Sequence, residues 1–434
     1  MSVIKSLGYN LVIGNEALKS LSVFLQKKKY SSIYILCDDN TLKFCLPALI
    51  ISCQKLKKAE IIEIENGEAS KSIEIVAQIL QTLVENQADR NSLVINLGGG
   101  VVSDLGGFCA SIYKRGIDFI NVPTSLLAMA DASVGGKTGI DFGGLKNSVG
   151  TFAQPRAVFI NPGFLETLSV RHFKNGLAEI FKIALVSDKK LWAELTDKKK
   201  SIGSSQLITK SLLLKNKIVL KDPYDQNLRK TLNFGHSIGH ALESLLLGSK
   251  AEMLHGEAIV VGMIIESSMA FQNKLITKEE LAEISSVLLF VFDPQKLIWM
   301  NGEYIRKTEN LQLKNEILNF DPTLREYDQT ILEKLIEPAK TRMKTLADFK
   351  ILVDPFVSNN KTGNSTTKSA VRNSLQDIEW NKESILSVLK KIIEEEGIKF
   401  PDMYEALIGA RQGLSLPDAY EALGREKTLE LLSS

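Results

Sequence analysis

Three of the four histidines of this chain, His236, His240 and His255, lie within twenty residues of one another. His236 and His240 are four residues apart in LNFGHSIGHALE, so a helix would present both on one face, and His255 follows in LHGEA. Imidazoles and one carboxylate form a common divalent-metal shell that leaves a position open for a substrate oxygen. We expect Glu179 in GLAEIFK to supply the carboxylate. The alternative is that these histidines only cap or pack helices. His172 stands alone and is expected at the surface.

The stretch from Gly98 to Asn147 is rich in glycine, lysine and acidic residues. An apolar run ends there on three consecutive glycines, as a buried parallel strand does where its carboxyl end opens on a ligand crevice. Glycines let the backbone approach a phosphate, and a helix that follows supplies free N–H groups for an anion. Two later glycine pairs precede Lys137 and Lys146, which suits a phosphorylated, carboxylated ligand. The alternative is that the glycines serve only as turns.

Cationic side chains gather in or beside the glycine-rich stretch and the histidine motifs. Each of them alone could be a solvated surface charge. Over the whole chain 53 Lys and Arg balance 51 Asp and Glu, so net charge implies neither a nucleic acid nor a membrane as partner. The local excess therefore favours an anionic small-molecule substrate. The cations concerned are Arg115, Lys137, Lys146, Lys182, Lys215 and Arg229.

The elements that must position these residues fall into three parts. Residues 1–164 alternate apolar runs with segments of helical period, which predicts a doubly wound, Rossmann-like α/β domain. The expected strands are YNLVIG, SIYILCDD, IIEIE, SLVINLGGG, FINVPTS and AVFINP. Residues 165–290 are expected to form an all-α metal- and substrate-binding domain, and residues 291–434 an all-α C-terminal module in which residues 358–374 resemble a linker.

The predicted sheet also provides a place for a dinucleotide. Asp38, Asn40, Glu65 and Glu68 follow two of the strands, at the edge where such a sheet meets the ribose and adenine. There is no strict GxGxxG, so the dinucleotide is inferred from topology together with GGGVVSD. A metal and a dinucleotide together suggest oxidation of an alcohol whose vicinal oxygens the metal holds.

The composition indicates a cytoplasmic protein. The four cysteines show no CxxC pairing, which fits a reducing compartment. The N-terminal residues do not have the pattern of a signal peptide, and no stretch is apolar for long enough to span a membrane. We therefore expect a cytoplasmic location and no membrane partner.

In order and spacing, the motifs closely resemble those of the 3-dehydroquinate synthases, in the sugar-phosphate cyclase superfamily. The resemblance runs from about residue 8 to about residue 290. It implies a carbon–oxygen lyase of the shikimate pathway, which leads to chorismate and the aromatic amino acids. The implied reaction converts 3-deoxy-D-arabino-heptulosonate 7-phosphate into 3-dehydroquinate and phosphate, with catalytic NAD and a divalent metal, zinc or cobalt. The matching motifs are GGGVVSDLGGF, YKRG, VPTSLLAMADASVGGKTGID, KNSVGTFAQP, GLAEIFK, LNFGHSIGHALE and LHGEAIVVGM.

Carried over by motif, the resemblance assigns a role to individual residues of this chain. The implied metal ligands are Glu179, His236 and His255, with His240 assisting proton transfer. The implied NAD contacts are Asp38, Asn40, Glu68, Lys71, Gly100, Val101, Val102, Ser103, Asp104, Thr124, Ser125, Lys137, Lys146, Phe164, Leu165, Glu166 and Thr167. The implied substrate-site and catalytic residues are Asp131, Lys137, Asn147, Lys182, Lys215, Arg229, Asn233 and His240. Arg115 matches an arginine that reaches the substrate phosphate of a neighbouring subunit, which implies a homodimer.

After about residue 290 the chain resembles a different family, in the motifs FDPQKLIWMNGEYIR, TRMKTLADF and MYEALIGARQGLSLPDAYEALGREKTLELL. These are similar to the C-terminal, anticodon-binding part of bacterial glutamyl-tRNA synthetases. The HIGH-type and KMSKS-type catalytic motifs are absent, so the resemblance implies contact with tRNA but no aminoacylation. The chain is thus interpreted as a fusion.

Other functions remain open at this point. The first is another sugar-phosphate cyclase or a metal-dependent polyol dehydrogenase. The second is a truncated cyclase, fused to a tRNA-binding module and with little activity, because the family's last helical segment is not recognisable in the sequence. In that case we expect an uncovered apolar face on the helices of residues 254–292.

Overall fold

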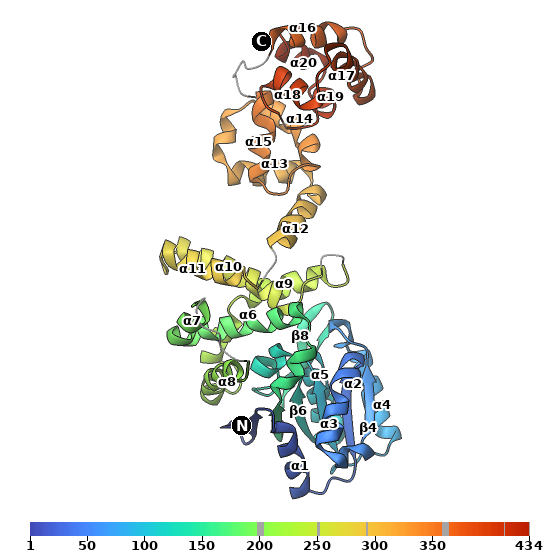
Figure 1. Ribbon diagram of the computed structural model, residues 1–434, viewed down its shortest axis with the longest axis vertical. Helices are drawn as coiled ribbons and strands as arrows, with labels where there is room; N and C mark the ends of the chain where they lie inside the picture. The colour runs from blue at the N-terminus through green and yellow to red at the C-terminus, as the bar shows by residue number, and fades with distance from the viewer. Residues whose placement is uncertain (198–203, 250–251, 292–293, 358–363, 412, 434) are drawn as a thin grey trace. The chain divides into compact units, whose positions relative to one another are not determined.

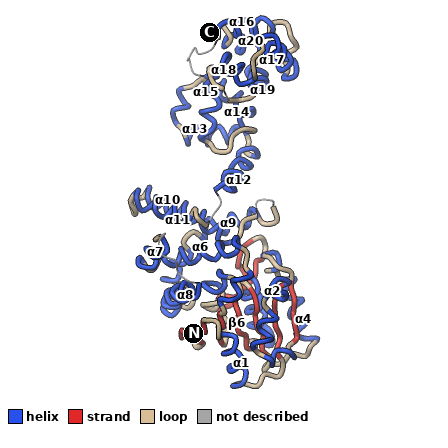
Figure 2. The backbone as a smooth tube through the Cα atoms, in the orientation of Figure 1, coloured by secondary structure: helices blue, strands red, loops and turns tan. Residues whose placement is uncertain are grey.

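The computed structural model describes residues 1–197, 204–249, 252–291, 294–357, 364–411 and 413–433. These residues form two compact units, Met1–Asp293 and Pro294–Ser434. Strands occur in the first part of the N-terminal unit, and the described residues of the C-terminal unit are all helix or loop (Figure 2).

A seven-stranded sheet organises the first part of the N-terminal unit (Figure 1). Neighbouring strands are parallel except for β1 and β2 at one edge. The chain runs from β3 outward to β4 and then returns to β5 on the other side of β3, which makes a topological switch between β3 and β5. In spatial order the strands are β1 (Ser2–Lys5), β2 (Asn10–Ile13), β9 (Ala157–Ile160), β6 (Asp118–Pro123), β5 (Leu93–Gly98), β3 (Ile33–Asp38) and β4 (Glu60–Ile64). All six predicted strands are present, and β1 is an addition.

Helices cover both faces of this sheet, because successive side chains of a strand point to opposite sides. Ile35 and Cys37 of β3 pack into one core with α1 (Ala17–Lys27) and α3 (Leu46–Ser52). Tyr34 and Leu36 of the same strand pack into a second core. That core is shared with α4 (Ile73–Glu85) and α5 (Gly100–Ile112), whereas α2 (Asp39–Phe44) follows β3 directly. The predicted doubly wound α/β arrangement is confirmed.

The stretch after β6 contains a hairpin, where the sequence pattern predicts only glycine turns. Strands β7 (Lys137–Phe142) and β8 (Leu145–Phe152) pair antiparallel, outside the main sheet. Gly143 and Gly144 form the two-residue turn between them, with φ of 60° and 78°. Positive φ at both positions gives a turn whose twist matches that of the two strands. Glycine-rich composition hid the strand pattern, although the turn itself was predictable.

The rest of the N-terminal unit is helical and gathers at one edge of the sheet (Figure 1). Its helices are η5 (Pro162–Thr167), α6 (Val170–Ser187), α7 (Lys189–Thr196), α8 (Ser204–Lys221), η6 (Leu228–Asn233), α9 (His236–Leu246), α10 (His255–Gln272) and α11 (Lys278–Leu288). The turn η3 (Tyr113–Arg115) lies between α5 and β6, and the π-helical turn η4 (Ala128–Ala132) lies between β6 and β7.

The C-terminal unit has a core of its own, built from buried residues such as Ile305, Leu335, Phe349 and Tyr420. Its helices are α12 (Pro294–Lys307), α13 (Asn310–Phe320), η7 (Pro322–Glu326), α14 (Gln329–Lys340), α15 (Ala347–Val357), α16 (Ser365–Ser374), α17 (Lys382–Glu396), α18 (Phe400–Ile408), α19 (Leu416–Leu423) and α20 (Arg425–Leu431).

The predicted linker of residues 358–374 is wrong over its second half, because residues 365–374 form α16. Asn364 caps this helix by accepting from Thr366 N, and Val371 is fully buried in the core. Residues 358–363 lie outside the described residues.

Within the described residues no helix is long and apolar enough to cross a membrane.

Close packing of α5 on the sheet generates a stability prediction. A Cβ atom at Gly106 would lie 1.9 Å from Asn96 Oδ1 and 2.8 Å from Leu36 Cδ2. Asn96 is buried and donates to Asn121 Oδ1 at 2.9 Å, so it has little room to move. Gly106→Ala should lower the free energy of unfolding by roughly 1–3 kcal/mol through overpacking, although alanine is the better helix former. Urea denaturation of the full chain measures this change.

The matched control is Gly100→Ala on the same helix, where the nearest atom, Ala132 Cβ, lies 3.5 Å away. This variant should be at least as stable as the parent. Equal midpoints for the two variants would contradict the packing argument.

Candidate functional site

The three clustered histidines meet in space, as predicted. The ligand-type atoms of His236, His240 and His255 lie within 4.8 Å of one another. His236 and His240 come from the first turns of α9, and His255 is the first residue of α10. Glu179 on α6 faces them, with Oε1 at 3.7 Å from His236 Nε2 and 3.4 Å from His255 Nε2. Three helices thus bring three imidazoles and one carboxylate together.

Glu179 is the most unusual group of this cluster, because its side chain is fully buried. Burial opposes its charge, yet the neighbouring Lys182 ammonium and the two histidines hold the pKa of Glu179 well below its usual range. Lys182 lies one turn further along α6 and contacts Oε2. Neither carboxylate oxygen accepts a hydrogen bond of ordinary geometry from the described residues. Oε1 of Glu179 therefore faces the histidine cluster, while Oε2 contacts the Lys182 ammonium.

The imidazoles are oriented by groups on their outer side. His236 Nδ1 lies 3.2 Å from Phe234 O, and His255 Nδ1 lies 3.0 Å from Glu243 Oε2. In both rings the Nε2 atom is left to face Glu179, as metal-binding histidines require. Burial, together with Lys182, lowers the pKa of His236 to about 3, so this ring is neutral. Burial disfavours the charged form of His255 too, but the carboxylates of Glu179 and Glu243 on either side of the ring outweigh it and raise its pKa to about 10.

A second polar group lies at the carboxyl ends of β4 and β5. Lys71 is buried, and its Nζ lies 2.7 Å from Asp104 Oδ2 and within hydrogen-bond distance of Asn147 Oδ1. Lys146 lies 2.6 Å from Glu68, and its Nζ is also 3.5 Å from Glu243. Burial opposes the charge of Lys146, but the carboxylates of Glu68 and Glu243 outweigh it and raise its pKa. Lysines of the predicted dinucleotide edge are thus held by acids from several elements.

The other expected NAD contacts lie along the same edge of the sheet. Asp38 ends β3 and caps α2 by accepting from Thr41 N at 2.7 Å, while Asn40 is exposed beside it. Thr124 is buried at the end of β6, and its N–H donates to Gly98 O at 3.0 Å. Ser125 follows it, and its hydroxyl accepts from Ala128 N at 3.3 Å.

The glycine motif itself forms the start of α5. Gly98 ends β5 and Gly100 begins the helix, with Val101 partly buried. Val102 and Ser103 are buried, so their side chains face the core and only their backbone could face a ligand at the helix start.

The expected substrate cations Lys182, Lys215 and Arg229 all lie near the carboxylate of Asp131. Lys215 on α8 contacts Asp131 Oδ1 at 2.7 Å, and it donates to the carbonyl of the same residue. Asp131 belongs to the π-helical turn η4, an arrangement that is rare and often found at functional sites. Burial lowers the pKa of Lys215 to about 8. Arg229 is also buried and donates to Gly135 O at 2.9 Å and to Pro223 O at 2.8 Å.

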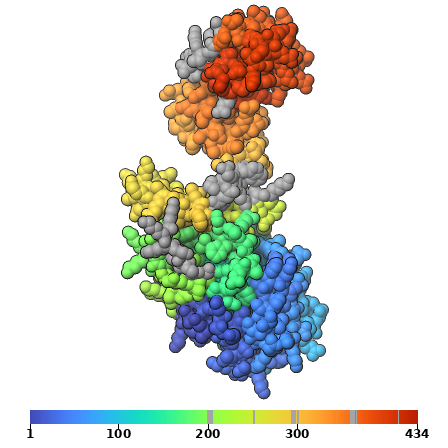
Figure 3. Space-filling model, viewed as in Figure 1, coloured from blue at the N-terminus to red at the C-terminus, as the bar shows by residue number. Residues whose placement is uncertain are grey.

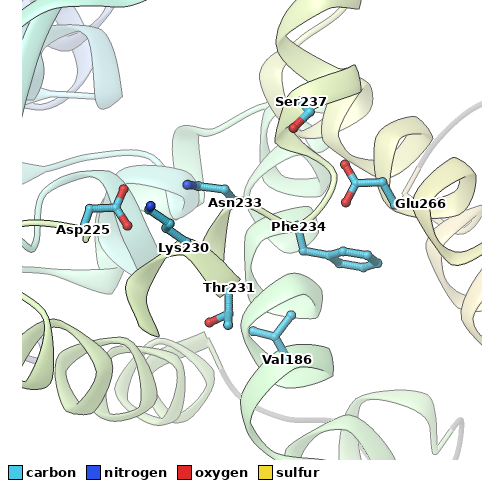
Figure 4. A pocket seen from close by; sticks show the side chains of 8 residues that line it. All are labelled: Val186, Asp225, Lys230, Thr231, Asn233, Phe234, Ser237 and Glu266. Atoms are coloured by element: carbon cyan, nitrogen blue, oxygen red, sulfur yellow. The ribbon is translucent and has the colours of Figure 1, made fainter. Parts of the chain in front are cut away.

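Asn233 lies on the wall of a cavity of about 590 Å³ (Figure 4). In Figure 4 the side chains of Asn233, Lys230 and Asp225 lie close together at one end of the cavity. Lys137, from the hairpin, forms an ion pair with Asp225. The cavity is lined by Val186, Asp225, Lys230, Thr231, Asn233, Phe234, Ser237 and Glu266.

Two groups of predicted residues lie apart from the cluster. Arg115 is exposed in the turn η3, at the amino end of β6, whereas the site lies at the carboxyl ends of the strands. Phe164 and Thr167 belong to η5 after β9, two strands away from β5. Leu165 and Glu166 of the same turn line a separate cavity of about 310 Å³. His172 is exposed, as expected.

Sequence reasoning did not single out Glu243 or Asp225. Glu243 lies seven residues after His236, so helical spacing alone could have placed it on the face of the two histidines. Asp225 has a φ of 57° in the loop before η6, and no spacing in the sequence links it to Lys137.

Comparison with known proteins identifies the family. Residues 61–175 match the sequence model "3-dehydroquinate synthase N-terminal", and residues 176–310 match "3-dehydroquinate synthase C-terminal". The 3-dehydroquinate synthase of Alkaliphilus oremlandii is 37% identical over 318 residues, which cover 71% of this chain and 86% of that protein. The chain belongs to the 3-dehydroquinate synthase family. The Helicobacter pylori strain G27 synthase is also 37% identical, over 73% of this chain and 96% of its own length.

The C-terminal residues have a different relationship. Residues 311–433 match the sequence model "Anticodon binding domain". The prediction that the chain joins parts of two different families is therefore confirmed. The synthase model ends at residue 310, about twenty residues beyond the end expected from the motifs.

Solved structures agree with the family. ValA, a 2-epi-5-epi-valiolone synthase from Streptomyces hygroscopicus with NAD+ and Zn2+ bound, is 28% identical with a TM-score of 0.58, covering 67% of this chain and 82% of that one. A 2-deoxy-scyllo-inosose synthase complexed with carbaglucose-6-phosphate, NAD+ and Co2+ is 24% identical and shares the fold, with a TM-score of 0.59 over 66% of this chain and 82% of its own.

The histidine cluster predicts that metal content depends on His255. His255→Ala removes an imidazole that faces Glu179, so the purified protein should lose most of its divalent metal while its circular dichroism stays unchanged. Elemental analysis measures the metal. His172→Ala is the control, because that histidine is exposed, and full metal content in His255→Ala would show the assignment to be wrong.

Proposed function

We propose that this chain converts 3-deoxy-D-arabino-heptulosonate 7-phosphate into 3-dehydroquinate and phosphate in the shikimate pathway. The observation that carries the proposal is the fully buried Glu179 facing three histidines, in a chain of the 3-dehydroquinate synthase family. Buried lysines and an arginine beside it supply the positive charge that a phosphorylated acid needs.

The residues present fit a divalent metal, zinc or cobalt. Glu179 has buried oxygens without ordinary donors, and His236 and His255 present Nε2 to it. We assign these three residues as ligands and His240 as a neighbouring group that assists proton transfer. His240 lies within the same 4.8 Å cluster and is therefore also placed to approach the ion.

The carboxyl edge of the sheet fits NAD. We assign the α5 start at Gly100 to the pyrophosphate, because free N–H groups of a helix start favour an anion. Asp38, Asn40 and Glu68 lie where the ribose and adenine would meet the sheet. When bound, NAD supplies a reversible hydride acceptor and the metal polarises a ring oxygen of the substrate. Binding of NAD and zinc by ValA, a relative at 28% identity, supports both assignments.

The chain's own residues then bind and orient the substrate. Lys182, Lys215 and Arg229 are each at most 5% exposed, so their charges act at close range on the carboxylate and phosphate of the substrate. Asp131 keeps Lys215 in place. We also assign Asn147, Asn233 and Lys137 to substrate binding. Closure of the ring needs chiefly correct positioning, and the substrate phosphate can serve as the base for its own elimination.

We propose three parts for the chain: an NAD-binding domain of residues 1–164, a helical metal- and substrate-binding domain of residues 165–290, and a helical module of residues 291–434. The exposed position of Arg115, away from its own site, fits a homodimer in which it reaches the partner's substrate. All four cysteines are free and buried, which suits the reducing cytoplasm where we place the protein.

We propose further that turnover is weaker than in a synthase with its full C-terminal segment. Large apolar side chains are exposed on and beside α10 and α11, the segment drawn in yellow in Figure 3. Met269 of α10 is 53% exposed, and Leu275 and Phe290, which lie on either side of α11, are 77% and 62% exposed. The far end of the expected face, Phe292, lies outside the described residues. Such side chains usually lie beneath another element, which suggests that a covering segment is missing from this domain.

A second role, contact with tRNA, is proposed for the C-terminal module on its match to an anticodon-binding domain. Residues 294–434 hold 20 Lys and Arg against 22 Asp and Glu, so binding would depend on local patches rather than net charge. Salt-dependent binding of tRNA to the full chain would support this role. No binding at low salt would exclude it.

The proposed reaction predicts chelator-sensitive phosphate release. Purified protein with NAD should release phosphate from 3-deoxy-D-arabino-heptulosonate 7-phosphate, lose that activity after treatment with EDTA, and regain it with zinc or cobalt. We expect a rate below that of the Alkaliphilus oremlandii synthase measured beside it. No release under any condition would contradict the proposed function, and an equal rate would contradict the missing-segment argument.

The lowered pKa of Lys215 predicts a pH dependence of substrate binding. This ammonium is charged well below pH 8 and loses its charge as the pH rises through about 8, so KM for the anionic substrate should rise above that pH. Arginine stays charged, so Lys215→Arg should abolish this rise even where it lowers kcat. KM measured between about pH 7 and pH 10 tests this, and an unchanged inflection in the variant would contradict the role of Lys215.

A further inference from the structure

Glu243 is a buried carboxylate on α9 that the proposed function leaves without a role. Its side chain is 6% exposed, and it follows His240 by three residues on the same helix. Isolated buried carboxylates are costly, so each oxygen of Glu243 should have a compensating partner. Its two partners are His255, which the proposed function assigns to the metal site, and Lys146, which belongs to the expected NAD contacts.

The first partner is a proposed metal ligand. Glu243 Oε2 lies 3.0 Å from His255 Nδ1, on the side of the ring opposite to Glu179. In the neutral ring that a metal binds, an Nδ1–H that donates to Glu243 leaves the lone pair on Nε2, which is the atom that faces Glu179 at 3.4 Å. Glu243 therefore fixes both the tautomer and the direction of the imidazole.

The second partner comes from the hairpin. Glu243 Oε1 lies 3.5 Å from Lys146 Nζ, and Lys146 in turn lies 2.6 Å from Glu68 and 3.5 Å from Asp141. Lys146 is 6% exposed, so water screens this contact weakly. The ammonium limits the positions that the Glu243 carboxylate can take relative to His255.

His236 offers an internal comparison. Its Nδ1 lies 3.2 Å from a backbone carbonyl, Phe234 O, which belongs to its own chain segment. Orientation of His236 thus needs no distant side chain, whereas orientation of His255 depends on a carboxylate from another helix and on a lysine from the β7–β8 hairpin.

We propose that Glu243 is a positioning residue of the metal centre, held by Lys146, so that the hairpin at the cofactor edge acts on metal affinity through Glu243 and His255. The proposal rests on the metal site of the proposed function and extends it. Glu243 itself touches neither the metal nor the substrate in this role.

The test measures Co2+ affinity of the NAD-free protein by competition with a chelator, together with the visible absorption spectrum of the bound Co2+. Glu243→Ala should bind Co2+ about 10- to 100-fold more weakly and change the spectrum, because His255 loses its orienting acceptor. Glu243→Gln retains an oxygen that accepts from Nδ1–H and should stay much closer to the parent. Ser244→Ala, one residue along the same helix and exposed, is the matched control and should be unchanged.

A double-mutant cycle tests the part of Lys146. Lys146→Met should weaken Co2+ binding in the parent, by less than Glu243→Ala does, and should have no further effect in the Glu243→Ala background. Additive effects, or no effect of Lys146→Met in the parent, would overturn the link to the hairpin.

The outcomes separate this inference from the proposed function. If the parent binds no Co2+ at a single site, the metal site itself is wrong. If the parent binds Co2+ but Glu243→Ala binds it equally well, the positioning role is wrong and the metal site stands. Equal losses in the alanine and glutamine variants would also overturn the role, because they would show that charge, and not the hydrogen bond, is what matters.

Discussion

The carboxylate of Glu179 is a charge with no exposure to water, and the helical part of the N-terminal unit is arranged around it. Burying an unpaired carboxylate costs several kcal/mol, so it persists only where cations or metal compensate it. Lys182 on the same helix and His255 on α10 provide this compensation, and the neutral His236 on α9 faces the same carboxylate. The helices must therefore approach closely. Gly256 illustrates the constraint, because a Cβ there would lie 2.1 Å from Asn175 O on α6.

The same constraint connects the helical part to the sheet. The π-helical turn η4 leaves the sheet after β6 and presents Asp131 to Lys215, while the hairpin brings Lys146 to Glu68 and Glu243. A chain of contacts between acidic and basic side chains thus runs from Glu68 at the dinucleotide edge through Lys146 and Glu243 to His255. An arrangement of this kind holds side chains rigidly, which is what a reaction dominated by positioning requires. The C-terminal unit has a buried core of its own.

Much of the fold and of the site followed from local patterns. Apolar runs ending in polar or glycine residues predicted six strands, and the four-residue spacing of His236 and His240 predicted that they share a helix face. The hairpin was missed because glycine and lysine weaken the alternating pattern of β7 and β8. The ion pair of Lys137 with Asp225 joins residues 88 apart, and no local rule predicts such a contact. Residues 365–374 seemed too polar for a helix because α16 buries only a narrow apolar face, at residues such as Val371.

The central claim is that Glu179, His236 and His255 form one metal site at the carboxyl edge of this sheet. A crystal structure of the protein with zinc and NAD, with anomalous data collected at the zinc edge, tests this claim most directly. The account predicts one strong anomalous peak within bonding distance, about 2.0–2.2 Å, of Glu179 and both histidine Nε2 atoms. A peak elsewhere, or an intact cluster without a peak at saturating zinc, would contradict it.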